Sequence, residues 1–318
     1  MRPWPLRVAL VAGTLAGAGF NSAAAAEPPR VVATIPPIHS LAAAVMAGAG
    51  EPTLLVRGNA SPHGYQLRPS EAAAIQDADV VVWVGPGFET FMERPLGNLG
   101  AGTRVVTLLE APGVERLPAR EGGAWEAHDA EEHHEGAEED HGHGEHDPHI
   151  WLSPANAQAM VRAIAANLAA ADPDRAPLYR ANEERAVQEL AALDEELDAA
   201  LAPVRGKPFV VFHDAYQYLE AAYGLNAAGS ITVSPDRPPS ARRRVELAEK
   251  IERSGAVCAF GEVQAASPLV GTLVADKGIG TGQLDPEGGT TVTPGPTAYA
   301  ELMRRNVDAL VDCLSRAS

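Results

Sequence analysis

The chain is poor in cysteine, in aromatic residues and in positive charge, and each scarcity narrows the possible functions. Neither Cys258 nor Cys313 has another cysteine or a histidine beside it at metal-ligand spacing, which argues against a cysteine-based metal centre. Aromatic residues make up 5% of the chain; they give no sign of an oligomer interface, and we expect a monomer. The 25 Lys and Arg are outnumbered by 42 Asp and Glu, and the resulting net charge of −17 argues against a nucleic-acid partner.

Long hydrophobic runs are also missing, with one exception at the N-terminus. Arg2 and Arg7 flank the start of an apolar stretch, 8–20, and alanines follow up to Ala26. This arrangement predicts a signal peptide at 1–26, cleaved near Ala26, and hence a periplasmic protein. The alternative is a membrane anchor, but the stretch is short for a span of roughly 20 residues. No cysteine lies near the cleavage site, which excludes lipid attachment there.

The predicted export determines the expected state of the two cysteines. In an oxidising compartment an isolated pair is expected to form a disulfide. The bond between Cys258 and Cys313 would close a loop of about 56 residues and contribute roughly 4 kcal/mol in the chain-entropy model. Two buried free thiols are the alternative.

Strand and helix patterns alternate along most of the chain. Short runs rich in apolar and β-branched residues predict strands at 31–35, 79–85, 104–109, 208–212, 227–233, 257–262 and 277–284. Helical patterns lie between them, at 38–48, 154–171, 214–223, 240–254, 266–276 and 297–316. The longest helical pattern, 174–203, has leucines at helical spacing and stops at Pro203.

This alternation predicts an α/β fold of two lobes, each a parallel β-sheet flanked by helices, joined by a long rigid helix. The predicted domains are an N-terminal lobe at 27–172, a linker helix at 173–203 and a C-terminal lobe at 204–318.

An acidic, histidine-rich segment, 112–148, interrupts the first lobe. Its part 121–148 has eleven Asp or Glu and no Lys or Arg. With so few apolar residues it cannot bury enough surface to offset its ordering entropy, so we expect disorder. Its six histidines, clustered with carboxylates, predict weak and exchangeable metal binding; the alternative is a solvated polar loop. They are His128, His133, His134, His141, His143 and His146.

Three of the remaining four histidines lie at loop or strand ends. His63 is bracketed by polar residues and prolines, His149 precedes an apolar stretch, and His213 directly follows a predicted strand. Open α/β sheets bind ligands outside the carboxyl ends of their strands. Three such histidines, drawn from both lobes, predict one site in the cleft between them.

Local structure explains two other polar residues. Pro69 and Ser70 predict the start of a helix with Ser70 as its cap. His39 lies at the start of a predicted helix, where capping or packing is the better interpretation.

Four short motifs carry a family resemblance. SPHGYQLRPS contains His63, DPHIWLSP contains His149, VFHDAY contains His213 and LDPEG contains Asp285. With the signal peptide, the long connecting helix and the histidine-rich loop, this order and spacing resembles the zinc-binding components of bacterial zinc-uptake ABC transporters. These are the ZnuA-type members of the cluster A-I metal solute-binding proteins. The resemblance covers essentially the whole mature chain.

The resemblance implies a function and a site. The protein would not be an enzyme; it would capture Zn²⁺ with His63, His149 and His213, with Asp285 as a candidate fourth ligand. It would deliver the ion to a membrane permease driven by a cytoplasmic ATPase, and a periplasmic zinc metallochaperone is a further candidate partner. The two cysteines match a disulfide of the zinc-specific branch.

The resemblance leaves the fourth ligand position open. Some zinc-binding relatives have an acidic residue directly before the first histidine, where this chain has Pro62. The fourth ligand is then Asp285 or a water molecule. Alternatively, Asp285 is only a turn residue before Pro286.

Other functions stay open. Three imidazoles suit zinc better than manganese, and manganese-binding relatives typically carry a carboxylate in place of His213, yet copper would also bind tightly. A manganese- or iron-binding protein and an adhesin are alternatives on the same scaffold. An exported zinc hydrolase would need a general base near the metal, and the chain has no H-E-x-x-H motif.

Overall fold

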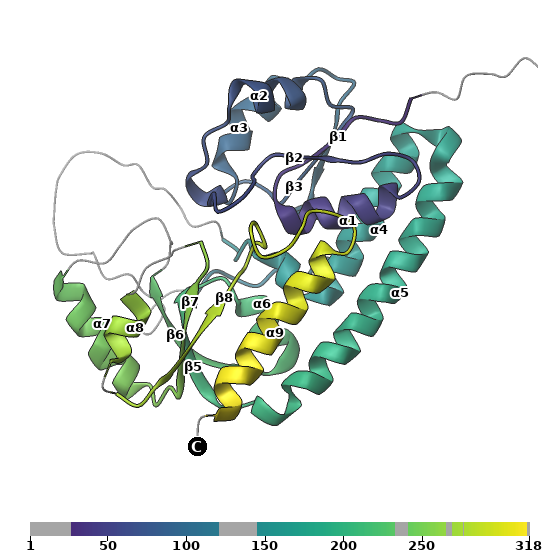
Figure 1. Ribbon diagram of the computed structural model, residues 1–318. Coiled ribbons are helices and arrows are strands. Elements are labelled where there is room, and N and C mark those ends of the chain that lie inside the picture. The colour runs from purple at the N-terminus through teal and green to yellow at the C-terminus, as the bar shows by residue number, and fades with distance from the viewer. Residues whose placement is uncertain (1–26, 121–144, 233–240, 265–268, 276, 317–318) are drawn as a thin grey trace, which may run out of the picture.

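The computed structural model describes residues 27–120, 145–232, 241–264, 269–275 and 277–316. The predicted signal peptide and five of the six loop histidines lie outside the described residues. Figure 1 shows two sheet-containing lobes with a long helix along their side. Among the described residues, no helix combines the length and hydrophobicity needed to cross a bilayer.

The N-terminal sheet is parallel and covered on both faces. Its strands are β1 (Val31–Ala33), β2 (Thr53–Leu54), β3 (Val80–Trp83) and β4 (Arg104–Thr107), in the order β2-β1-β3-β4. Because strand side chains alternate between faces, Val80 and Val82 pack with α1 (Pro36–Met46) and α4 (Pro154–Ala171). Val81 and Trp83 pack on the other side with α2 (Pro69–Gln76) and α3 (Thr90–Gly97).

The C-terminal sheet repeats this plan. Its strands are β5 (Pro208–His213), β6 (Asn226–Thr232), β7 (Cys258–Glu262) and β8 (Gly280–Leu284), in the order β6-β5-β7-β8 and again parallel. One face packs on α6 (Gln217–Tyr223) and α9 (Ala298–Arg316). The other packs on α7 (Ala241–Arg253) and α8 (Leu269–Val274). A disulfide joins Cys258 to Cys313 and fixes α9 to β7, as predicted.

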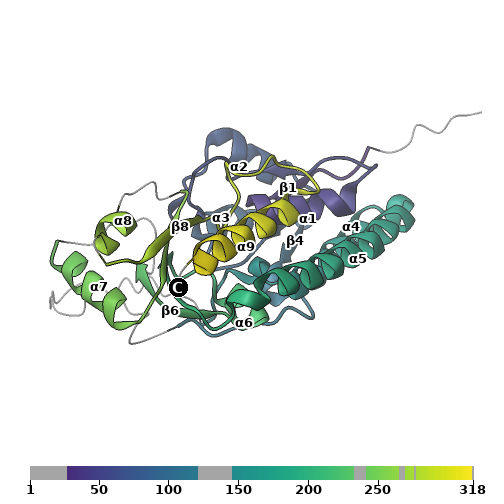
Figure 2. The same cartoon turned by 60° about the horizontal axis from the view of Figure 1, so that its bottom comes forward.

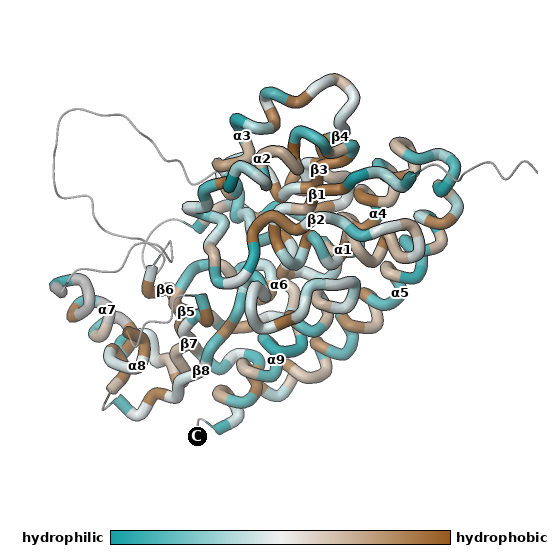
Figure 3. The backbone as a smooth tube through the Cα atoms, turned by 45° about the horizontal axis from the view of Figure 1, so that its top comes forward, coloured by the Kyte–Doolittle hydropathy of each residue, from teal (hydrophilic) through white to brown (hydrophobic). Residues whose placement is uncertain are grey.

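The long helix α5 (Ala176–Leu201) connects the lobes and packs on both. It contacts α1 and α4 of the first lobe and α9 of the second, an arrangement visible in Figure 2. Its colour alternates along the tube in Figure 3, as expected for a helix with one buried face. The leucines at 190, 193, 197 and 201 are all buried. The largest apolar cluster includes residues of both lobes and of α5, so the lobes share a core.

The predicted fold class is therefore confirmed, with local differences. The sequence pattern missed β2 and α3. Ser70 lies inside α2, and the helix is capped instead at Arg68, whose backbone N–H donates to the Glu71 carboxylate (2.8 Å). His39 is buried and donates from Nε2 to the carbonyl of Pro52 (3.0 Å), which confirms its packing role.

The expectation of disorder over 112–148 is wrong at both ends. The two ends of this segment pair with each other in antiparallel fashion, between Pro118 and His146. The hydroxyl of Tyr218, on α6, accepts from the Leu117 N–H (2.9 Å) and donates to the Asp147 carbonyl (2.8 Å). These contacts with the other lobe supply the stabilisation that the local composition lacks.

Candidate metal centre

The three predicted histidines come together. His63 lies in a 3-10 turn (Pro62–Gly64), His149 directly precedes another 3-10 turn (Ile150–Leu152), and His213 is the last residue of β5. One ring nitrogen from each can be chosen so that all lie within 4.8 Å of one another. This is the one such group of three or more His, Cys, Asp or Glu among the described residues. His149 and His213 are buried, and His63 is half-buried.

A carboxylate lies beside each of the two buried rings. Asp147 Oδ1 accepts from the backbone N–H of His149 (2.9 Å) and lies 2.7 Å from its Nδ1. Glu262 Oε1 lies 3.3 Å from Nδ1 of His213. A carboxylate on one ring nitrogen fixes the tautomer and leaves the other nitrogen as a metal ligand. For His149 this leaves Nε2 free to face a metal ion, while Glu262 acts on the His213 ring through its nearby charge.

The rings pack against one another and against an aromatic wall. Ring centroids are 5.0 Å apart for His149 and His213, 5.2 Å for His63 and His213, and 5.7 Å for His63 and His149. Phe88 lies 4.9 Å from His63 and 5.6 Å from His149, and Trp151 lies 5.3 Å from His149. Such surroundings exclude water from one side of the donor set and strengthen its electrostatic interactions.

Negative charge surrounds the site. Burial lowers the pKa of His213, but the Glu262 carboxylate beside it outweighs this effect, and the pKa ends above its ordinary value. Arg120, which enters the acidic segment, pairs with Asp214 (3.3 Å) and with Glu220 on α6. Carboxylates that favour a protonated imidazole equally favour a metal cation in its place.

Asp285 stays outside the histidine group. Its Oδ1 accepts from the backbone N–H groups of Glu287 (2.9 Å) and Gly288 (2.6 Å) and from the Gln264 side chain (2.5 Å), and its Oδ2 accepts from the Thr291 hydroxyl. The carboxylate thereby organises the loop after β8, which is the turn role that the sequence left open.

Sequence reasoning did not identify Asp147, Glu262 or Phe88. Asp147 was detectable, because it lies two residues before His149 in the DPH motif. Glu262 was not, because it approaches His213 only through the pairing of β7 with β5. His146, from the acidic segment, lies in the antiparallel bridge and not in the histidine group.

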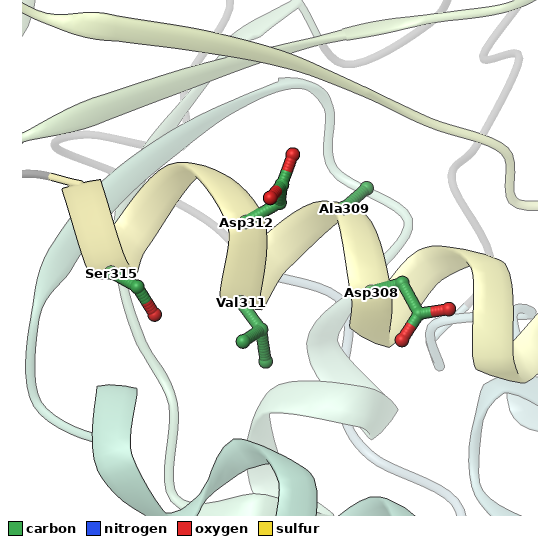
Figure 4. Close-up of a pocket in the computed structure, with 5 residues that line it drawn as sticks. All are labelled: Asp308, Ala309, Val311, Asp312 and Ser315. Atoms are coloured by element: carbon green, nitrogen blue, oxygen red, sulfur yellow. The ribbon is translucent and has the colours of Figure 1, made fainter.

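A shallow pocket on α9 is not part of this centre. It measures about 460 Å³ and is lined by side chains of that one helix, as Figure 4 shows: Asp308, Ala309, Val311, Asp312 and Ser315. It offers no imidazole.

Comparisons with known proteins identify the family. The family model of the periplasmic component A of the zinc-uptake complex, ZnuA, matches residues 31–313. The high-affinity zinc uptake system protein ZnuA of Brucella suis biovar 1 (strain 1330) is 44% identical over 321 residues, covering 94% of this chain and 96% of that protein.

Solved structures give the same result. A crystal structure of ZnuA has a TM-score of 0.70 at 26% identity, covering 89% of this chain and 99% of that chain. Zn(II)-bound AdcA from Streptococcus pneumoniae has a TM-score of 0.71 at 27% identity, covering 90% of this chain and 58% of that chain. The family resemblance read from the four motifs is confirmed, and the chain belongs to the ZnuA family of periplasmic zinc-uptake components.

Proposed function

We propose that this protein captures Zn²⁺ with His63, His149 and His213 and hands it to the membrane permease of an ABC transporter for import. The observation that carries the proposal is the convergence of three imidazole nitrogens, one from each histidine, within 4.8 Å of one another. Zinc binds imidazole readily and accepts four ligands in tetrahedral geometry. The relatives named for zinc uptake and the Zn(II)-bound AdcA support the same cargo.

The chemistry of the donor set supports zinc over manganese. Imidazole nitrogen suits zinc, whereas manganese prefers carboxylate and water oxygens. Asp147 and Glu262 lie beside Nδ1 of His149 and His213 and outside the group of three ligands, so they would balance the charge of the ion without occupying its ligand positions. Since Asp285 holds its own loop, we assign the fourth position to water. We propose that the bound zinc is transported cargo and that the protein is not an enzyme.

Zinc binding should weaken in acid. An imidazole must be neutral to bind the ion, so protons compete with zinc and the affinity falls as the pH drops towards 5. The negative surroundings make the proton a stronger competitor at His213, whose pKa is raised.

A titration of metal-free protein with zinc tests the proposal. Wild type should bind one zinc per chain tightly, and manganese should not displace it. His213→Gln should lower the affinity by at least about 100-fold, because losing partners that only orient a ligand already costs 10- to 100-fold. His39→Gln is the matched control, since His39 is buried but outside the group. A triple His→Gln variant with unchanged tight binding would refute the site.

We propose that the histidines of the acidic segment are auxiliary. Ala119 donates its backbone N–H to the Glu145 carbonyl (3.2 Å), so a short linker can replace 121–144 without moving the flanking chain. The deletion should remove weak additional zinc equivalents and keep the tight one. Loss of tight binding in a folded deletion variant would contradict this.

We also propose that residues 1–26 are a signal peptide that is removed on export. Measuring the mass of the exported chain tests this.

A further inference from the structure

We propose that Gly289 is a positioning residue for His63. Its backbone lies directly against that of Gly58 across the two lobes, and this contact places the loop that carries His63. The inference rests on the proposed function, because it concerns how one zinc ligand is brought to the other two.

The loop that carries Gly289 is a firm support. Asp285 donates its backbone N–H to Oδ1 of Asn306 on α9 (2.8 Å), and Asn306 Nδ2 donates to the Asp285 carbonyl (2.6 Å). The Asp285 carboxylate then accepts from the Gly288 N–H (2.6 Å) and from the Thr291 hydroxyl. Both sides of Gly289 are therefore tied to one buried aspartate, which is itself tied to α9.

The same loop also contacts the first lobe. The indole N–H of Trp151 donates to the carbonyl of Pro286 (2.7 Å). The hydroxyl of Thr290 donates to Oδ1 of Asn59, a residue 231 positions away in the sequence (2.7 Å). Gly289 lies between these two contacts.

Only glycine fits at 289. A Cβ placed there would lie 1.8 Å from the carbonyl oxygen of Gly58 and 2.9 Å from its carbonyl carbon. The backbone of Gly289 is outside the left-handed region, so alanine is excluded by this contact and not by its own conformation. The obstacle is main chain, which cannot rotate aside as a side chain would.

Gly58 is five residues before His63. The intervening chain enters the 3-10 turn at Pro62, where the Ser61 hydroxyl accepts from the His63 N–H (3.3 Å). His63 lies in this turn, a short stretch of chain away from the contact at Gly58, whereas His149 and His213 lie on other segments. A displacement of Gly58 should therefore be felt mainly at His63.

The expected size follows from the tolerance of metal sites. Alanine at 289 must widen the contact from 1.8 Å to at least 3.0 Å to be accommodated at all, and to 3.4 Å before an ordinary separation is reached. Metal–ligand distances tolerate about ±0.2 Å. We expect the affinity for zinc to fall roughly 10- to 100-fold, as when an orienting partner is lost.

A double-mutant cycle tests the inference, with zinc affinity measured by chelator competition. Gly289→Ala should weaken binding in the wild-type background and have little further effect in His63→Ala, because the group it positions is then absent. Gly100→Ala is the matched control: no atom lies within 4 Å of its Cβ position, and its φ is outside the left-handed region. Urea unfolding of the zinc-free variants checks that each is folded.

A second variant covers the case in which Gly289→Ala does not fold. Thr290→Val removes the hydrogen bond to Asn59 without a clash, and it should weaken zinc binding in the same direction by a smaller factor.

Two outcomes would overturn this inference and leave the proposed zinc site standing. One is a folded Gly289→Ala protein with wild-type affinity, and the other is an equal loss with and without His63. Wild-type affinity in His63→Ala would instead refute the proposed zinc site, and the inference with it.

Discussion

Replacing Glu89 by glutamine should remove a loss of folding stability that the wild-type protein suffers as the pH rises. Glu89 is fully buried at the end of the loop that follows β3, next to Phe88, which packs on His63 and His149. Its Oε2 accepts from the backbone N–H groups of Val84 (2.7 Å) and Gly85 (3.2 Å). Burial raises the pKa of this carboxyl from 4.5 to about 7.

The sign and size follow from proton linkage. Between pH 4.5 and about 7, the unfolded chain releases this proton while the folded protein retains it. The free energy of unfolding therefore falls as the pH rises, by about 1.4 kcal/mol per unit. The total is about 3 kcal/mol, of which about 2.5 kcal/mol is lost between pH 5 and pH 8. Glutamine keeps an acceptor oxygen for both N–H groups and carries no charge at either pH.

Urea denaturation of zinc-free protein at pH 5 and pH 8 measures the effect. Glu89→Gln should gain about 2.5 kcal/mol over wild type on going from pH 5 to pH 8. Glu93→Gln changes an exposed carboxyl on α3, the helix that follows Glu89, and should show no such gain. A Glu89→Gln protein that differs from wild type by the same amount at both pH values would refute the reasoning.

Three further changes have definite expected results. The double variant Cys258→Ala/Cys313→Ala should lose about 4 kcal/mol of unfolding free energy under non-reducing conditions while keeping one tight zinc, and an unchanged denaturation midpoint would contradict the chain-entropy argument. Arg120→Met should lower the free energy of unfolding by about 3 kcal/mol at pH 8 and by less at pH 5. Burial raises the pKa of its partner Glu220 to about 7, so at pH 5 that carboxyl is protonated and no charge is left unpaired. An equal loss at the two pH values in urea denaturation would contradict this. Asp285→Asn should lower zinc affinity far less than loss of any of the three histidines, and a loss of equal size in competition binding would make Asp285 a ligand.

Much of the fold could be predicted because it depends on local patterns. The apolar run at 79–85 and the leucines of α5 are periodic, and a parallel sheet or a two-sided helix is the way to bury them. The two elements that were missed give weak local signals. β2 has only two residues, and α3 contains Pro95 and buries a single side chain, Met92.

The limits of composition are clearest at the acidic segment. Its sequence predicts disorder from residue 112, yet Leu117, Pro118, His146 and Asp147 make defined contacts in the structure. Tyr218 and the partners of Arg120 belong to the other lobe, and their contribution cannot be read from the segment itself. Ser70 has the residue type of a helix cap, but the cap lies two residues earlier, at Arg68, whose backbone N–H donates to the Glu71 carboxylate.

Residue types and their spacing along the chain were enough to predict the two-lobe architecture, the disulfide-forming cysteines and the three histidines proposed as zinc ligands. Only the folded chain reveals that Glu262 lies beside His213, that Asp285 organises a loop, and that Gly289 lies against Gly58. These are contacts between residues far apart in sequence. Strand order and the packing of the lobes, which no local pattern encodes, bring them within a few ångströms.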